Sequence, residues 1–312
     1  MQCQVCASDG PFRDISVREM LLGAGLEFDY CECRKCGSVQ IKAIPPAEVL
    51  EQAYASRYRT LQARPHPWLR DWVRREKDRH FLGFGSPLGK LMSAVEHDPM
   101  IGILADLKLK RDSRVLDVGC GIGYLLDRLA RTGMTSLVGA DPFMPAHYRT
   151  AMGVPVLNVS VEGVPGPFDV VMFNHSLEHV PDAAETLRSA RSKLVDGGIC
   201  LVRIPTTGSE AWETYGACWA QLDAPRHVVV PSRDGMAILA KRCGLILERT
   251  TDDSTGHYQF MASEAYKRGL TLQEAMDANV FSLQEVRDFA EKAAAANAAH
   301  RGDQAAFFLR AN

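Results

Sequence analysis

Two Cys-x-x-Cys pairs near the start of this 312-residue chain have the spacing of a metal site: Cys3 with Cys6, and Cys33 with Cys36. Each pair can place two thiolates on one tight turn, and two such turns complete a closed tetrahedral site of the kind that holds a structural zinc ion. In a reducing compartment this clustering favours a metal over disulfides. Two alternatives stay open: Cys31 replaces Cys33 as a ligand, or the thiols cluster without binding a metal.

A glycine-rich turn forms a second candidate site, in which Asp117, Gly119, Gly121 and Gly123 follow the pattern Asp-x-Gly-x-Gly-x-Gly. Glycines let the chain turn sharply and let a ligand approach the backbone with no Cβ in the way. The dinucleotide-binding pattern Gly-x-Gly-x-x-Gly fails, because the sixth position counted from Gly119 is the bulky Tyr124. Nicotinamide binding is therefore disfavoured, and a turn with no ligand is the remaining structural alternative.

This turn resembles the cofactor loop of the class I S-adenosylmethionine-dependent methyltransferases. A further carboxylate, Asp141, stands beside Pro142 at the end of the next expected strand. Carboxylates suit the cationic amino group, the sulfonium and the ribose diol of that cofactor. The resemblance implies that Asp117 lies near the methionine end, that Gly121 forms the floor, and that Asp141 and the adjacent Pro142 lie at the ribose.

The fourth expected strand and the loop after it extend the resemblance. Asn174 and His175 are expected at the methionine end, because ligands bind beyond the carboxyl ends of such strands. Ser160 and Val161 match the position that faces the adenine in relatives. The pair Glu178-His179 recurs in ubiquinone-type O-methyltransferases, where it can bind a divalent ion. In this chain two alternatives stay open for the pair: local hydrogen bonding, or a catalytic or metal-binding role.

The segment after the fifth expected strand is rich in polar chemistry, with Asp223, Arg226 and His227 close together. It resembles a Leu-Asp-Pro-Pro-Arg-His segment of methyltransferases from bacterial polysaccharide clusters. We expect His227 to act as a general base, since imidazole is largely unprotonated at neutral pH, with His175 and His179 as rivals. Arg226 would hold a phosphate or carboxylate of the acceptor. The structural alternatives are a salt bridge that braces the loop and a buried histidine without catalytic function.

A zinc ribbon fused to such a domain is similar to sugar C-methyltransferases of antibiotic pathways and to bacterial surface-polysaccharide methyltransferases. More distantly it resembles a group of ribosomal RNA guanine methyltransferases. We expect methyl transfer to a small-molecule acceptor, with an anionic sugar nucleotide as one form of it. RNA methylation is disfavoured because acids slightly outnumber basic residues over positions 1–44. A noncatalytic cofactor-binding scaffold is the third alternative.

The elements that must position these residues follow from the hydrophobic pattern. From about residue 112, strands alternate with helices, which predicts a doubly wound, mostly parallel Rossmann-like α/β sheet. Strands are expected near 114–118, 136–140, 154–159, 168–173, 199–204, 245–250 and 304–309, and helices near 122–132, 182–194 and 233–242. Capping signals at Thr271 and Ser282 predict two further helices in an insertion at about 262–303. We expect a zinc ribbon over 1–44, a helical linker over 45–111 and the cofactor-binding domain over 112–312.

The composition is that of an ordinary globular chain, with 36 Lys+Arg, 38 Asp+Glu and a net charge of −2. This balance gives no overall electrostatic field that would attract nucleic acid or an anionic membrane. Residues 57–80 are nevertheless locally basic. That stretch is either a solvated helix face or a surface for an anionic substrate. No apolar run approaches the roughly 18 residues of a membrane span, and the N-terminus lacks the regions of a secretory signal. We therefore expect a cytoplasmic protein.

Overall fold

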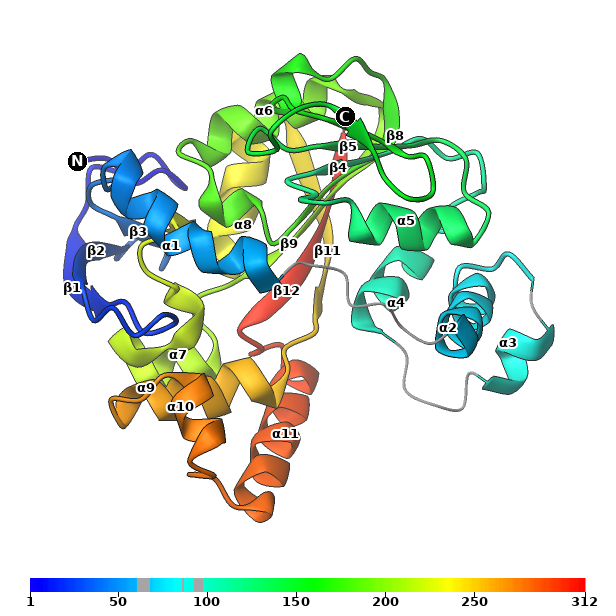
Figure 1. Cartoon of the computed structure of the whole chain (residues 1–312). Coiled ribbons are helices and arrows are strands. Elements are labelled where there is room, and N and C mark those ends of the chain that lie inside the picture. Colours follow the sequence, from blue (N-terminus) through cyan, green and yellow to red (C-terminus); the bar gives the residue numbers. More distant parts are fainter. Residues whose placement is uncertain (61–67, 86, 93–97, 312) are drawn as a thin grey trace. The chain divides into compact units, whose positions relative to one another are not determined.

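Figure 1 shows the computed structural model of the chain, which describes residues 1–60, 68–85, 87–92 and 98–311. The chain divides into two compact units. The first unit comprises Met1–Thr60, His175–Arg188 and Val202–Leu309. The second unit comprises Leu61–Asn174, Ser189–Leu201 and Arg310–Asn312.

The first unit contains an antiparallel sheet with the strand order β1-β2-β3-β10. Its strands are β1 (Phe12–Arg18), β2 (Glu27–Cys33), β3 (Val39–Ile41) and β10 (Val229–Val230). Val229 pairs with Gln40, so a segment far along the chain completes the N-terminal sheet. Tyr30, Trp212 and Trp219 are buried in the core beneath it. The first 44 residues therefore share their sheet and their core with the segment that follows His227.

The same unit holds β11, most of β12 and the end of β9, which are neighbours in the order β11-β12-β9. Their bounds are β9 (Leu194–Pro205), β11 (Leu245–Asp252) and β12 (Gln304–Ala311). The helices of this unit are α1 (Ala47–Thr60), α7 (Glu210–Tyr215), α8 (Arg233–Arg242), a π-helix (His257–Ala262), α9 (Ser263–Lys267), α10 (Leu272–Asp277) and α11 (Leu283–Ala298). Capping boxes at Thr271 and Ser282 begin α10 and α11, which confirms both predicted starts.

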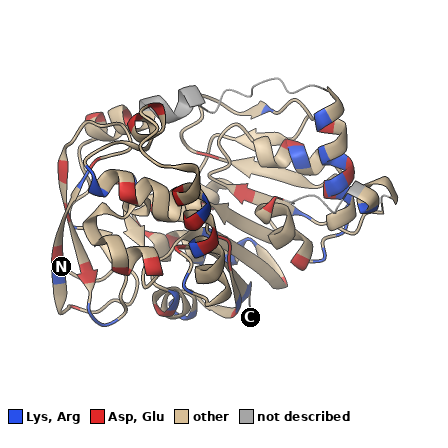
Figure 2. Ribbon diagram, turned by 90° about the horizontal axis from the view of Figure 1, so that it is seen from below, with Lys and Arg blue, Asp and Glu red and all other residues tan. Residues whose placement is uncertain are grey.

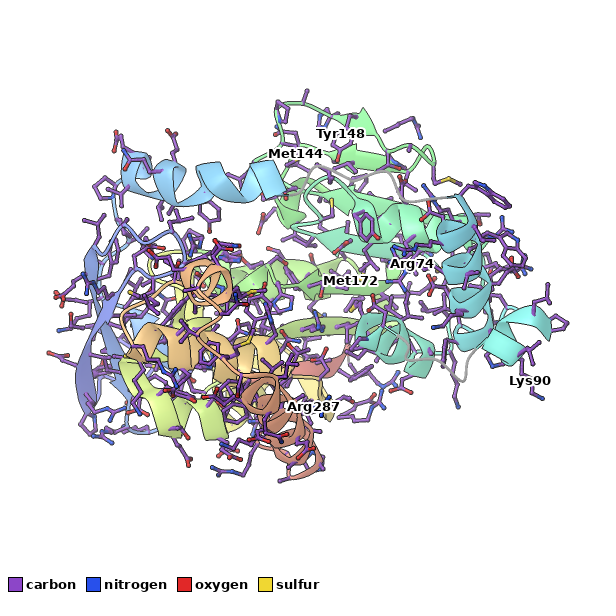
Figure 3. All side chains as sticks on the ribbon, turned by 60° about the horizontal axis from the view of Figure 1, so that its bottom comes forward. Arg74, Lys90, Met144, Tyr148, Met172 and Arg287 are labelled. Carbon is purple, nitrogen blue, oxygen red and sulfur yellow. The ribbon has the colours of Figure 1, made fainter. Side chains whose placement is uncertain are left out.

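The second unit carries the sheet order β9-β8-β4-β5-β7-β6. Its strands are β4 (Val115–Val118), β5 (Leu137–Ala140), β6 (Tyr148–Arg149), β7 (Pro155–Leu157) and β8 (Phe168–Asn174). The pairs β8–β4, β4–β5 and β5–β7 are parallel, and β6 pairs antiparallel with β7. Every residue of β4 is buried, as is Met172 on β8 (Figure 3), which is typical of parallel strands covered on both faces. The predicted mostly parallel α/β sheet is confirmed.

The second unit also contains the helices α2 (Trp68–Phe81), α3 (Pro87–Met92), α4 (Pro99–Asp106) and α5 (Tyr124–Arg131). Leu126 and Leu129 of α5 are fully buried, and their i, i+3 spacing places both on one face of the helix. Figure 1 shows α5 directly after β4 in the chain and alongside the strands of this unit. The glycine turn between β4 and α5 is thereby fixed at both ends.

Among the predicted strands, β9 differs most from its sequence-based boundaries. The predicted helix near 182–194 is α6 (Ala183–Ser192), but β9 begins at Leu194, five residues before the predicted start. Gly197 and Gly198 lie within β9. Gly197 has a φ of +71°, a left-handed conformation that glycine adopts readily, so the strand continues through it. The second helix of the predicted insertion, α11, ends at Ala298.

Charges on α2 are largely paired. Arg128 donates to Asp78 at 2.6 Å and to Asp98 at 2.5 Å, and Arg75 lies 3.0 Å from Glu76. Arg64 lies outside the described residues, as do the side chains of Arg57 and Arg59. Figure 2 shows Lys and Arg interspersed with Asp and Glu. These contacts show that part of the charge of the basic stretch is paired within this unit. None of the described helices is both long and apolar enough to cross a membrane.

Candidate cofactor and catalytic sites

The glycine turn after β4 adopts a backbone that only glycine takes readily. Gly119, Gly121 and Gly123 have φ values of +74°, +53° and +69°. A Cβ on Gly123 would lie 2.6 Å from the Thr150 side chain, whereas a Cβ on Gly121 would meet nothing within 4 Å. Gly121 therefore has open space on the face where a side chain would stand. This is the arrangement that a ligand lying against the backbone requires.

Asp141 at the end of β5 supports the turn. Its two carboxylate oxygens accept hydrogen bonds from the amides of Gly121 and Phe143, each at 2.9 Å. A carboxylate has about four acceptor positions, so both oxygens retain capacity for ribose hydroxyls. Pro142 follows on the surface. The hydroxyl of Tyr148, labelled in Figure 3, donates to the Gly121 carbonyl at 3.2 Å.

Asp117 is the buried acid of this site, with 3% of its surface exposed. Burial, reinforced by the nearby Asp141, raises the pKa of Asp117 to about 8. A cationic group brought against this carboxyl would restore its ionised form. The carboxyl groups of Asp117 and Asp141 thus fit the amino group and the ribose of S-adenosylmethionine.

The other predicted cofactor residues divide between the units. The amide of Asp141 donates to the carbonyl of Leu157 at 3.0 Å, which places Ser160 and the buried Val161 just past the strand beside Asp141. Asn174 is the last residue of β8 in the second unit. His175 belongs to the first unit, and its side chain contacts residues of that unit.

The four predicted zinc ligands lie together in the first unit. The sulfurs of Cys3, Cys6, Cys33 and Cys36 are all within 4.8 Å of one another, with Cys3–Cys36 and Cys6–Cys33 separations of 3.7 Å. Four sulfurs about 2.3 Å from a tetrahedral ion stand about 3.8 Å apart, so the cluster fits zinc. The Cys31 sulfur lies 3.8 Å from that of Met1 and outside the group. Between Cys31 and Cys33, the geometry favours Cys33.

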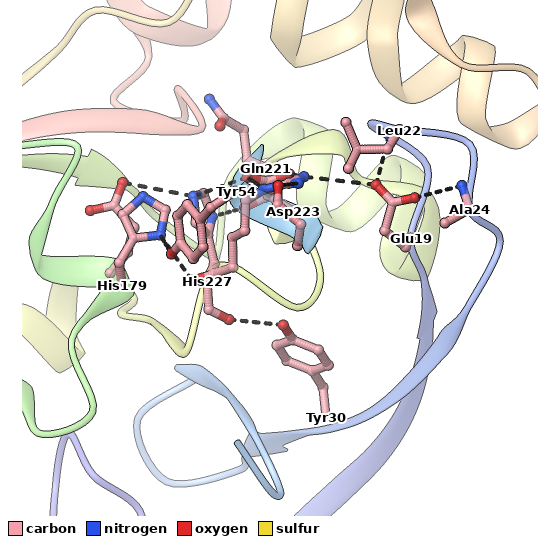
Figure 4. A network of polar contacts seen from close by, with 12 residues as sticks. Glu19, Leu22, Ala24, Tyr30, Tyr54, His179, Gln221, Asp223 and His227 are labelled. Carbon is pink, nitrogen blue, oxygen red and sulfur yellow. Dashed lines mark hydrogen bonds and ion pairs between the residues drawn. The ribbon is translucent and has the colours of Figure 1, made fainter. Parts of the chain in front are cut away.

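A second polar cluster surrounds His227 (Figure 4). One ligand-type atom each of Glu178, His179 and His227 lies within 4.8 Å of the others, and Glu178 is fully buried. The Nδ1 of His227 lies 2.7 Å from the Gln221 carbonyl. Because a carbonyl only accepts, this Nδ1 carries the hydrogen, and Nε2 has the free lone pair of a base.

Two carboxylates face that Nε2, Asp223 at 3.6 Å and Glu178 at 3.8 Å. Burial lowers the pKa of His227, and the two carboxylates oppose this effect. For Glu178, burial opposes ionisation, but the neighbouring His175, His179 and His227 outweigh it and lower its pKa to about 2. Burial thus favours the neutral form of His227, and the neighbouring histidines favour the ionised form of Glu178.

Arg226 is used by the protein itself. Its side chain is 1% exposed, and it pairs with both carboxylate oxygens of Asp223 while donating to the Ala53 carbonyl at 3.0 Å. Glu19 lies 3.9 Å away, held by the amides of Leu22 and Ala24 (Figure 4). These contacts favour the alternative in which Arg226 forms a salt bridge that braces the loop, over the one in which it contacts an acceptor.

His179 has hydrogen-bond partners within the same unit. Its Nδ1 lies 2.8 Å from the Arg226 carbonyl and 3.2 Å from the Tyr54 hydroxyl. Sequence reasoning missed Tyr54, Glu19 and Tyr30 as parts of this site. No local pattern could have found them, because each meets the cluster across more than a hundred residues of chain.

Comparison with known proteins identifies the domain. Residues 97–249 match the sequence model of a family described as a methyltransferase domain. Over this range the chain contains a methyltransferase domain. The matched range of this methyltransferase domain includes Asp117, Asp141, Glu178 and His227, whereas the four-cysteine cluster lies outside it.

Curated relatives match parts of the chain. A ubiquinone biosynthesis O-methyltransferase of Serratia proteamaculans is 34% identical over 111 residues, which cover 32% of this chain and 46% of that protein. A tRNA U34 carboxymethyltransferase of Alcanivorax borkumensis is 29% identical over 188 residues, covering 54% of this chain and 56% of that protein. The chain thus spans about half the length of these relatives.

A solved structure of a Burkholderia thailandensis 1,6-didemethyltoxoflavin-N1-methyltransferase aligns with 88% of this chain and 96% of its own. Its sequence identity is 14% and its TM-score is 0.44.

Proposed function

We propose that this chain transfers a methyl group from S-adenosylmethionine to a small-molecule acceptor. The observation that carries this proposal is the glycine turn: Gly121 is open to a ligand, and Asp117 and Asp141 stand beside it. The acids suit the amino group and the ribose, while Ser160, Val161 and Asn174 would complete the adenine and methionine ends. When bound, the cofactor supplies an electrophilic methyl group on a sulfonium.

The acceptor class we favour is a sugar or sugar nucleotide of a surface-polysaccharide or natural-product pathway. The curated relatives are named for ubiquinone biosynthesis and for tRNA, so their names do not support a sugar. The support comes from the combination of a four-cysteine N-terminal segment with the loop that holds Asp223, Arg226 and His227.

In the proposed reaction His227 receives the acceptor's proton. A hydroxyl is a poor nucleophile at neutral pH unless a base takes its proton as the carbon–oxygen bond forms. The Nε2 of His227 is the atom with a free lone pair, and the negative charges of Asp223 and Glu178 stabilise the imidazolium that results. Breaking the carbon–sulfur bond leaves S-adenosylhomocysteine as the second product.

The cysteine cluster is proposed to hold one structural zinc ion. A site closed by four thiolates has no open position for a substrate. Residues 1–44 would then form the ribbon, 45–111 a helical linker and 112–312 the methyltransferase domain, in a protein of the reducing cytoplasm.

Methylation of RNA is the second candidate function, because the relative named for tRNA matches 54% of this chain. A transfer assay decides between the candidates. The full chain is incubated with methyl-labelled S-adenosylmethionine and either a panel of nucleotide sugars or unmodified tRNA. We expect label in at least one sugar. Label in tRNA alone would favour the second candidate, and binding of the cofactor with no labelled product in either pool would favour a noncatalytic scaffold.

A further inference from the structure

A groove with a volume of about 500 Å³ lies against one face of α2 in the second unit. Its lining residues on this face recur at helical spacing, so they share one side of the helix: Leu69, Arg70, Val73, Arg74, Lys77 and Phe81. Three of these side chains are apolar and three are cationic. The groove therefore offers hydrocarbon contact and positive charge together.

The carboxylates that line this groove are already paired with an arginine of α5. Asp78 and Asp98 both accept hydrogen bonds from Arg128, at 2.6 and 2.5 Å. A further acid of α2, Asp71, lies 3.4 Å from Arg131. The groove is lined by four cationic side chains and two carboxylates, so it carries a net positive charge. Because Arg128 contacts both carboxylates, the positive charge that remains belongs to α2.

Arg70 and Arg74 are the exposed cations of the groove. Neither forms an ion pair with a carboxylate in the part of the chain that the structure describes. Nη1 of Arg74, which is labelled in Figure 3, donates to the Tyr124 hydroxyl at 2.6 Å, and a hydroxyl leaves the charge of the guanidinium uncompensated. Arg70 and Arg74 are one helical turn apart, so their two guanidinium groups can bind neighbouring phosphate groups.

Two large apolar side chains are exposed at the start of the same helix. Trp68 is 78% exposed and Leu69 is 52% exposed, whereas Trp212 and Trp219 are buried. An exposed apolar patch bordered by polar side chains marks an interaction surface. A helix that combines Trp and Leu with Arg and Lys is typical of proteins that lie on a membrane, where an indole ring has both apolar and wet surroundings.

We propose that this face of α2 docks onto the surface of an anionic phospholipid membrane. Arg70 and Arg74 contact lipid phosphates, and Trp68 and Leu69 enter the upper part of the hydrocarbon region. Charge complementarity and exposed hydrocarbon together select this occupant, because a free phosphate ion would leave Trp68 and Leu69 in water. The net charge of the chain is −2, so the attraction has to come from this local surface. The inference does not depend on methyl transfer.

Sedimentation with vesicles tests the proposal on the full chain and needs neither cofactor nor acceptor. Vesicles of phosphatidylcholine alone are compared with vesicles of phosphatidylcholine and phosphatidylglycerol in equal parts. We expect binding to the anionic vesicles to be at least about tenfold stronger, because each basic residue near an anionic surface contributes roughly a factor of five. Raising the salt from about 0.1 M to about 1 M shortens the Debye length from about 10 Å to about 3 Å and should weaken this binding.

Paired variants locate the contact. Arg70→Gln/Arg74→Gln should weaken binding to the anionic vesicles by about 25-fold, a factor of about five for each arginine. The matched control is Arg287→Gln/Lys292→Gln, which removes two exposed cations from α11 in the first unit. Because the proposal assigns the contact to α2, this control should change the affinity by less than about twofold.

The indole of Trp68 reports whether the helix enters the lipid. On anionic vesicles the tryptophan emission should shift to shorter wavelength, and lipids brominated in the upper part of the chain should quench it. Trp68→Phe should remove both signals and retain binding, whereas Trp68→Ser should weaken binding. Leu283→Ser, at a side chain 82% exposed on α11, is the apolar control and should bind as the wild type does.

Three results would overturn the proposal: no binding to anionic vesicles at low salt, equal weakening by the α2 and α11 double variants, or binding with no change in the emission of Trp68. Binding of tRNA that is lost in Arg70→Gln/Arg74→Gln, with no binding to vesicles, would assign this face to nucleic acid and would also overturn it. A chain that binds vesicles as expected but methylates no acceptor would leave this inference standing while the proposed function fails.

Discussion

The hydroxyl of Tyr30 donates a hydrogen bond to the backbone carbonyl of His227 at 2.8 Å, across 197 positions of sequence. The next residue, Val228, donates its amide to the Glu178 carbonyl at 2.7 Å and accepts from the Ile41 amide at 2.9 Å. The N-terminal sheet and the Glu178 loop together fix the backbone at His227. The N-terminal segment therefore helps to hold the backbone of the His227 loop in place.

Tyr30→Phe tests this attachment. The substitution keeps the buried ring and removes one hydrogen bond, so the free energy of unfolding should fall by about 1 kcal/mol. Denaturant unfolding measures the change. Tyr258→Phe, at a side chain 51% exposed, is the matched control and should change stability by less than about 0.5 kcal/mol. Equal stability of the Tyr30→Phe variant and the control would show that the contact contributes nothing.

The cysteine cluster makes a prediction about metal content. Wild-type protein and Cys31→Ser should each carry about one zinc ion per chain, because Cys31 lies outside the cluster, whereas Cys33→Ser should lose it. Elemental analysis of protein purified without chelator gives the stoichiometry. Full retention in Cys33→Ser, with loss in Cys31→Ser, would reverse the ligand assignment. No zinc in the wild type would remove the proposed site.

The raised pKa of Asp117 predicts that a proton is released when the cofactor binds. Its folded pKa of about 8 lies above the ordinary value of 3.8, so at pH 7 the free protein holds a proton there that a cationic ligand should displace. The same shift makes this group's contribution to stability fall as the pH rises from about 4 to about 8. Calorimetry at pH 7 in buffers of different ionisation enthalpy should detect up to about one proton released. Asp117→Asn should abolish the release; an unchanged value in that variant would assign the proton to another group.

His227→Gln tests the proposed base once an acceptor is known. The variant should lower kcat by about 10² to 10⁴ and leave cofactor affinity nearly unchanged, because the imidazole acts on the acceptor's proton. His300→Gln, at a side chain 78% exposed, is the control. A kcat within about threefold of wild type, with chemistry rate-limiting, would move the role to His179.

What the sequence could predict was local. The strand before the glycine turn, the turn itself and the helix starts at Thr271 and Ser282 are each specified by residues a few positions apart. The contacts of His227 with Tyr30 and of His175 with Arg203 depend on tertiary packing and leave no periodic signal. The two-residue strand β10 was missed for the same reason: its pairing with β3 is set by the fold.

The contacts of Arg226 show most directly what sequence cannot predict. An arginine beside a histidine in a loop is compatible with binding an anionic acceptor, and only the buried contacts with Asp223 and Ala53 show how its donors are used. Sequence spacing specifies which groups are near in the chain. It does not specify which of these groups already have hydrogen-bond or ion-pair partners in the folded protein.

A calorimetric titration of the full chain with S-adenosylmethionine shows whether the glycine turn binds this cofactor. We expect one cofactor per wild-type chain and binding at least about tenfold weaker in Asp141→Ala, which loses both the ribose acceptor and the hydrogen bond to Gly121, with Asp112→Ala on the surface as the unaffected control. Unchanged affinity in Asp141→Ala, or tighter binding of NAD than of S-adenosylmethionine by the wild type, would contradict the account.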